Sequence, residues 1–184
     1  MRVLALSGSL RRDSYNTALL RAAAEVAPQG VEVELYAGLA SLPPYDADSD
    51  VGTGPEPVRD LRERIAAADG LLVATPEYNG SIPGLLKNAV DWASRPFPGS
   101  ALRGKTVAVI GASTGAYGGM WAQTELRKSL GVAGARVLQE GVAVPMAQER
   151  FDAGGTLLDA ALRDRLAALL AALAVEAAPI ATAA

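Results

Sequence analysis

Short apolar runs alternate with longer segments of helical periodicity along most of the chain. Five runs predict β-strands, at residues 3–7, 31–36, 71–74, 106–111 and 136–144. The first, third and fourth runs are almost continuously apolar, as expected for strands that are covered on both faces. Strands that alternate with helices are typical of βαβ units, so we predict an α/β fold with a five-stranded parallel sheet.

The run at 31–36 differs from the others because glutamates alternate with its apolar residues. This alternation indicates a strand with one face in solvent, which fits the edge of a sheet. An edge position for the second strand agrees with the strand order 2-1-3-4-5, in which helices cover both faces.

The segments between the strands carry apolar residues at helical spacing. The first helix is expected after Ser14, a candidate N-cap, and its stop signal is Pro28-Gln29-Gly30. Later helices are expected from Val58 to Ala68, at 85–93 and at 120–130, and a last one carries leucines at 158, 162, 166, 169 and 173. We predict one domain over residues 1–178 and a frayed tail at 179–184.

The composition restricts the chemistry that the chain can perform. Its 184 residues include no cysteine and no histidine, which excludes a disulfide framework, a cysteine nucleophile, a zinc cluster and a histidine-based triad. We predict no metal site. If the chain is an enzyme, a cofactor performs the difficult step or carboxylates, Lys, Tyr and Ser act unaided, and the first option is simpler.

The charge pattern restricts the partners. The chain has 17 basic and 20 acidic residues, and its longest basic block is the pair Arg11 and Arg12, so we expect no nucleic-acid partner. The uncharged apolar stretch at 166–175 is well short of the roughly 18 residues that span a bilayer. The apolar N-terminal run is too short for a secretory signal. We therefore expect a cytoplasmic protein with no membrane partner.

Three loops follow the first, third and fourth predicted strands, at residues 8–17, 75–84 and 111–119. In an open α/β sheet, the carboxyl ends of these strands meet where the strand order reverses, and ligands bind at that point. The middle loop is long and contains two prolines and two glycines, which fits either a ligand loop or a plain turn. Four glycines in the last loop fit close approach to a planar ligand or a flexible connection.

The loop at 8–17 indicates an anion site. A helix N-terminus, the hydroxyls of Ser9, Ser14 and Thr17 and a guanidinium from Arg11 or Arg12 all favour a phosphate. The alternative is that Ser14 only caps the helix. The loop lacks the Gly-Lys-Ser/Thr of a triphosphate loop and the glycines of a dinucleotide loop, so a monophosphate cofactor fits best.

Two motifs at these positions resemble a known family. The first is Gly-Ser-Leu-Arg-x-x-Ser-x-Asn from Gly8, and the second is Pro-Glu-Tyr-Asn-Gly-Ser-x-Pro-Gly-x-Leu-Lys-Asn-Ala-x-Asp-Trp from Pro76. Over about the first 145 residues the chain resembles the NAD(P)H-dependent FMN reductases of flavodoxin-like fold, a group with quinone, azo-dye and chromate reductases. The resemblance implies a three-layer α/β sandwich.

The resemblance also implies which residues bind FMN. The expected phosphate contacts are Ser9, Arg11, Ser14 and Asn16. The expected contacts of the isoalloxazine ring are Pro76, Glu77, Tyr78 and Asn79, with Ser113 and Gly115 from the third loop. No side chain is expected to be catalytic, because the flavin N5 carries the chemistry. An acid-base role of Glu77 stays open beside a solvated or interface carboxylate.

The implied activity is a ping-pong oxidoreductase reaction. NADPH or NADH reduces FMN, and a quinone, an azo compound or a metal oxyanion then takes two electrons. The resemblance further implies a homodimer or a homotetramer. The alternative is a flavodoxin-type electron carrier that binds FMN without nicotinamide activity. Arg11 and Arg12 argue against the carrier, because flavodoxin phosphate loops usually lack arginine.

Overall fold

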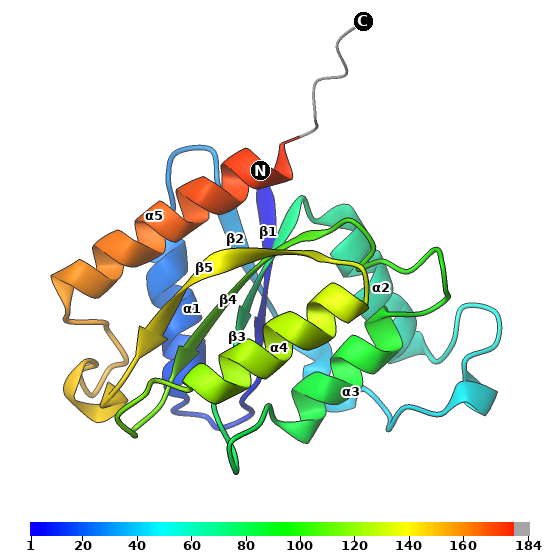
Figure 1. Cartoon of the computed structure of the whole chain (residues 1–184), viewed down its shortest axis with the longest axis horizontal. Coiled ribbons are helices and arrows are strands. Elements are labelled where there is room, and N and C mark those ends of the chain that lie inside the picture. Colours follow the sequence, from blue (N-terminus) through cyan, green and yellow to red (C-terminus); the bar gives the residue numbers. More distant parts are fainter. Residues whose placement is uncertain (179–184) are drawn as a thin grey trace, which may run out of the picture.

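The computed structural model describes residues 1–178 and contains the parallel sheet that the sequence predicts. Its strands are β1 (Arg2–Ser7), β2 (Glu32–Tyr36), β3 (Gly70–Ala74), β4 (Thr106–Ala112) and β5 (Arg136–Val144). They pair in the order β2-β1-β3-β4-β5, which confirms the predicted order (Figure 1). The predicted tail at 179–184 lies outside the described residues.

Helices cover both faces of the sheet and complete the three layers. The five α-helices of the described chain are α1 (Tyr15–Glu25), α2 (Glu56–Ala67), α3 (Gly84–Ala93), α4 (Met120–Val132) and α5 (Ala160–Ala177). Short 3-10 helices lie at Gly38–Ser41, Ala47–Ser49 and Ala147–Glu149. One apolar core joins α1 and α5 to the sheet, and a second joins α2, α3 and α4 to its other face. No α-helix within residues 1–178 is both long and apolar enough for a membrane span.

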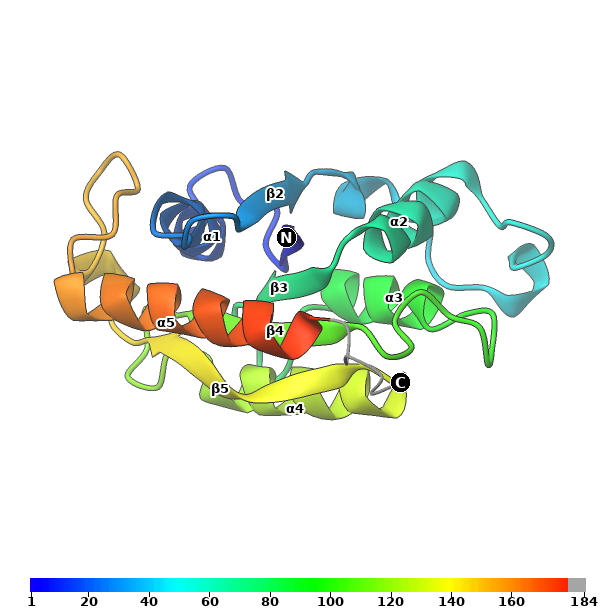
Figure 2. The same cartoon turned by 90° about the horizontal axis from the view of Figure 1, so that it is seen from above.

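Burial along the strands follows the sequence pattern. Every residue of β3 and β4 is buried, whereas β2 has no fully buried residue and pairs only with β1. Figure 2 shows β2 and β5 on opposite sides of the central strands β3 and β4. The alternating run at 31–36 therefore forms an edge strand, as predicted.

The start of the last helix differs from the prediction. We expected Leu158 on its apolar face, but α5 begins at Ala160 and Leu158 is 63% exposed. The Asp159 carboxylate accepts a hydrogen bond from the Leu162 amide and so caps the helix one residue after Leu158. Leu158 therefore has the spacing of the helical leucines but lies outside the helix.

Trp92 belongs to the core. It is fully buried on α3, and its indole Nε1 donates a hydrogen bond of 2.8 Å to the Pro43 carbonyl. The ring of Tyr45 meets the Trp92 ring edge-on at 4.9 Å. Trp92 therefore holds the loop before α2 against the chain's own core.

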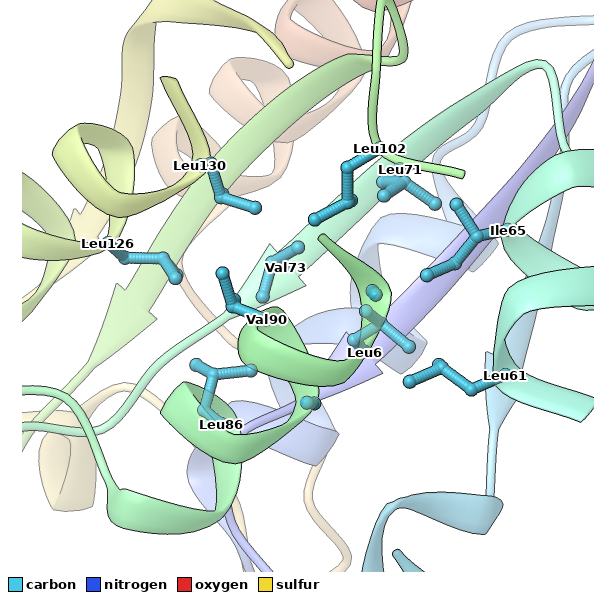
Figure 3. A pocket seen from close by; sticks show the side chains of 12 residues that line it. Leu6, Leu61, Ile65, Leu71, Val73, Leu86, Val90, Leu102, Leu126 and Leu130 are labelled. Atoms are coloured by element: carbon cyan, nitrogen blue, oxygen red, sulfur yellow. The ribbon is translucent and has the colours of Figure 1, made fainter. Parts of the chain in front are cut away.

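A small apolar void lies under α2, α3 and α4 (Figure 3). The side chains of Leu6, Leu61, Val73, Leu86 and Leu126 are among those that point into it. Its free volume is about 10 Å³, hardly enough for one water molecule, and no polar side chain lines it. We interpret it as a packing defect of the core rather than a ligand site.

Candidate active site

The loops that follow β1, β3 and β4 lie together at one end of the sheet, along the lower margin of Figure 1. Between them is a solvent-open cleft of about 110 Å³. It is lined by Ser9, Arg11, Ser14, Tyr15, Asn16, Pro76, Glu77, Tyr78, Ala112, Ser113 and Thr114. The fold thus brings together all of the predicted site residues except Asn79 and Gly115.

One end of the cleft is formed by the N-terminus of α1. Ser14 caps this helix as predicted, because its Oγ accepts a bond of 3.3 Å from the Thr17 amide. The Oγ of Ser9 accepts a bond of 3.4 Å from the Arg11 amide. Within residues 1–178 neither hydroxyl donates a hydrogen bond, and the Tyr15 and Asn16 amides have no acceptor. These free donors at a positive helix end fit a phosphate group.

Arg11 adds a positive charge to this cradle. Its guanidinium donates one bond of 3.1 Å to the Asp13 carbonyl and forms no ion pair with another described residue. Arg12 is exposed and does not line the cleft, and the Thr17 hydroxyl pairs with the Ser7 hydroxyl at 2.8 Å. Of the two arginines that the sequence offered, Arg11 therefore lines the cleft and Arg12 does not, and the Thr17 hydroxyl does not line it either.

Asn16 joins α1 to the end of β4. The Asn16 side chain is 3% exposed, and its Nδ2 donates to the Ala112 carbonyl while its Oδ1 accepts from the Ala112 amide, both at 2.9 Å. One Nδ2 hydrogen remains for a ligand. Asn16 therefore has a structural task, which is to hold the N-terminus of α1 against the start of the third loop.

The loop after β3 ends in a tight hairpin turn. Tyr78 and Ser81 exchange two backbone hydrogen bonds of 3.0 and 3.1 Å. Between them, Asn79 and Gly80 have φ angles of 55° and 74°, as in the two-residue turns that favour Asn-Gly. Asn79 consequently sits at the exposed tip, while Pro76, Glu77 and half-exposed Tyr78 line the cleft.

Two glycines of the third loop are required by the packing of the chain itself. A Cβ on Gly111 would lie 2.8 Å from the Thr75 carbonyl oxygen. A Cβ on Gly118, which has a φ of 60°, would lie 2.7 Å from the Val144 amide nitrogen. These two glycines therefore allow the chain to approach its own backbone.

The third loop is held in place by the segment that follows β5. The Met146 amide donates to the Gly115 carbonyl and the Ala147 amide donates to the Ser113 carbonyl, at 3.1 and 3.0 Å. The Ser113 Oγ accepts from the Gly115 amide at 3.1 Å. Ser113 thus reaches the cleft with a fixed backbone, and Gly115 lies on the exposed part of the loop.

Sequence reasoning missed three residues that line the cleft, namely Tyr15, Ala112 and Thr114. The Tyr15 ring packs on Phe151 with 5.6 Å between ring centroids, which is a contact across 136 positions of sequence. Thr114 lies inside the third loop beside Ser113. Its position in that loop was the signal that could have identified it.

An open parallel sheet of this order, with a phosphate-type cradle at its first helix, defines a flavodoxin-like protein. The family model described as NADPH-dependent FMN reductase matches residues 1–149. The chain is 45% identical over 174 residues to an NAD(P)H-dependent FMN reductase of Pseudomonas aeruginosa, covering 94% of this chain and 93% of the relative. The chain therefore belongs to the NADPH-dependent FMN reductase family, an enzyme family whose cofactors are FMN and a nicotinamide.

Other relatives agree with this assignment. A quinone reductase of Escherichia coli is 44% identical over 131 residues, which cover 71% of this chain and 69% of the relative. The solved structure of FerB, a flavoenzyme NAD(P)H:acceptor oxidoreductase from Paracoccus denitrificans, superposes with a TM-score of 0.84 at 34% identity and covers 96% of both chains.

Proposed function

We propose that the chain uses NAD(P)H to reduce FMN held in the cleft and then passes two electrons to a quinone or a similar acceptor. The observation that carries this proposal is one cleft that joins the donor-rich N-terminus of α1 to the loop from Pro76 to Tyr78. Membership of the family supports it, and so do the quinone reductase names of similar proteins. Azo compounds and metal oxyanions are the further acceptor classes that we propose.

Each part of the cleft has a role in this proposal. Ser9, Arg11 and Ser14 bind the phosphate of FMN, and Asn16 fixes the cradle that holds it. The backbone of residues 76–79 binds the polar edge of the ring, and Tyr78 forms an apolar wall beside it. Bound FMN supplies the transfer of hydride and electrons. The protein binds and orients, so no side chain is required as an acid or a base.

Initial-rate kinetics test the two half-reactions. With NADPH or NADH varied at several fixed concentrations of a benzoquinone, we expect parallel double-reciprocal lines, because the nicotinamide leaves before the acceptor binds. Intersecting lines would show that both substrates are bound together and would contradict the ping-pong order. An electron carrier of the flavodoxin type would show almost no turnover with either nicotinamide.

An exposed apolar patch lies next to the cleft and supports an oligomer. We define it as Tyr78, Tyr117, Met120 and Trp121, which are 50%, 57%, 50% and 56% exposed. The rings of Tyr117 and Trp121 pack together with 5.2 Å between centroids. Clustered aromatic side chains in solvent mark interaction surfaces. We propose that the chain forms a homodimer, or a homotetramer built from such dimers, through this patch.

Replacing Trp121 by alanine tests the proposed interface. We expect the dimer to dissociate at least about tenfold more readily, since a buried tryptophan is a frequent source of interface energy. Light scattering over a dilution series gives the dissociation constant. The matched control is Val132→Ala, which removes an 84% exposed apolar side chain near the other end of α4. A wild-type protein that stays monomeric would refute the proposal.

A further inference from the structure

The side chain of Glu77 reaches the start of α4. Its Oε2 accepts hydrogen bonds from the amides of Trp121 and Ala122, at 3.0 and 3.1 Å. These are the second and third residues of the helix, whose amides an N-cap side chain usually binds. Glu77 therefore supplies a cap from a loop that lies 44 positions earlier in the sequence.

Helix α4 needs such a cap because its own N-cap residue cannot provide one. That residue is Gly119, which has a φ of 73° and no side chain. A Cβ on Gly119 would lie 3.8 Å from the Cβ of Glu77, so Glu77 lies beside the start of the helix. A carboxylate at this position accepts hydrogen bonds from two otherwise unpaired amides, and its negative charge is attracted to the positive end of the helix dipole.

A second carboxylate also joins the loop after β3 to α4, but this one projects from the helix and binds the loop. Glu125 projects from α4, and its Oε2 accepts hydrogen bonds from the Ser81 hydroxyl at 2.5 Å and the Ile82 amide at 3.4 Å. Glu77 lies before the hairpin turn of the loop, and Ser81 closes that turn. The loop is therefore fastened to α4 on both sides of its tip.

The connection reaches residues beside the cleft. Trp121, whose amide Glu77 binds, packs on Tyr117 of the third loop. Glu77 itself lines the cleft, next to Pro76 and Tyr78. Movement of the start of α4 would consequently change the spacing between the second and third loops, which form two walls of the proposed flavin site.

We propose that Glu77 is a positioning residue, which acts with Glu125 to fasten the loop at 76–82 to α4 and so sets the width of the flavin seat. The effect on the flavin site rests on the proposed function. The capping of α4 by Glu77 does not depend on FMN. In this role Glu77 donates no proton to a substrate. Its carboxylate is an acceptor for two backbone amides.

Amide hydrogen exchange of the protein without FMN tests the structural part. In Glu77→Ala we expect the Trp121 and Ala122 amides to exchange about tenfold faster, because the first turn of α4 loses its cap. Glu77→Gln keeps an acceptor oxygen at the same place, so we expect exchange within about threefold of wild type. The matched control is Glu140→Ala, an exposed carboxylate on β5 that we expect to change neither amide.

Binding and pH profiles test the consequence for the site. We expect Glu77→Ala to weaken FMN binding by about tenfold and Glu77→Gln to restore most of that loss. The pH profile of kcat/KM should keep its shape in Glu77→Gln, since no proton passes through this carboxyl group. If Glu77→Ala does not fold, Glu77→Asp replaces it, because a side chain one methylene shorter cannot reach both amides in the same geometry.

Two outcomes would overturn the inference. Equal exchange of the Trp121 and Ala122 amides in wild type and Glu77→Ala would show that the carboxylate does not cap α4. Loss of one limb of the pH profile in Glu77→Gln would show an acid-base role instead. Failure of the wild-type protein to oxidise NAD(P)H would refute the proposed function, yet it would leave the exchange result for the cap intact.

Discussion

Replacing Asn16 by alanine is expected to lower the free energy of unfolding by about 2–4 kcal/mol and to weaken FMN binding by at least about tenfold. The substitution removes both hydrogen bonds to Ala112 and leaves a buried backbone amide and carbonyl without partners. The N-terminus of α1, where we propose that the phosphate binds, would then no longer be fixed to the end of β4. Urea unfolding of the protein without FMN and fluorescence titration with FMN measure the two effects.

Asn88 offers a matched control for this prediction. Its amide also bonds one backbone N–H and one carbonyl, those of Tyr45 and Pro43, but it lies on α3 outside the cleft. Asn88→Ala should therefore lower stability without changing the affinity for FMN. An Asn16→Ala variant that binds FMN as tightly as Asn88→Ala would contradict the role of Asn16 in the site.

Arg11→Ala is expected to weaken FMN binding by about 10- to 100-fold, the range of a charge-assisted hydrogen bond to a phosphate. Arg11 lines the cleft, and its guanidinium has no carboxylate partner among residues 1–178. The matched control is Arg12→Ala, because Arg12 is the neighbouring exposed arginine and does not line the cleft. Both variants should keep the stability of wild type.

Riboflavin separates phosphate binding from ring binding in the same experiment. It lacks the phosphate, so we expect Arg11→Ala to bind riboflavin as the wild type does. The loss of FMN affinity should also shrink as salt is added, since exposed charges are screened. Equal losses for FMN and riboflavin would show that Arg11 does not act on the phosphate.

The sheet could be predicted almost completely from the sequence because its signal is local. Fully buried strands read as apolar runs, and the alternating glutamates of β2 marked the edge. The end of the sheet that carries the cleft followed from the strand order alone. The start of α5 could not be read from leucine spacing, because Asp159 decides it by capping.

The internal connections of the site could not be predicted, because they join residues far apart in the sequence. Asn16 bonds Ala112, 96 positions away, and Glu77 bonds Trp121, 44 positions away. A motif identifies such residues as part of a site, but it does not distinguish a ligand contact from a bond that holds the protein together. Gly111 illustrates the same limit, since its missing side chain makes room for the carbonyl of Thr75.

An anaerobic titration of the purified protein, loaded with FMN, tests the central claim most directly. We predict that each chain binds one FMN and that addition of NADPH or NADH rapidly bleaches the visible absorbance of the flavin. Subsequent addition of a benzoquinone should restore the absorbance in full. The proposed function would be contradicted if the protein did not bind FMN. It would also be contradicted if neither NADPH nor NADH bleached the bound FMN.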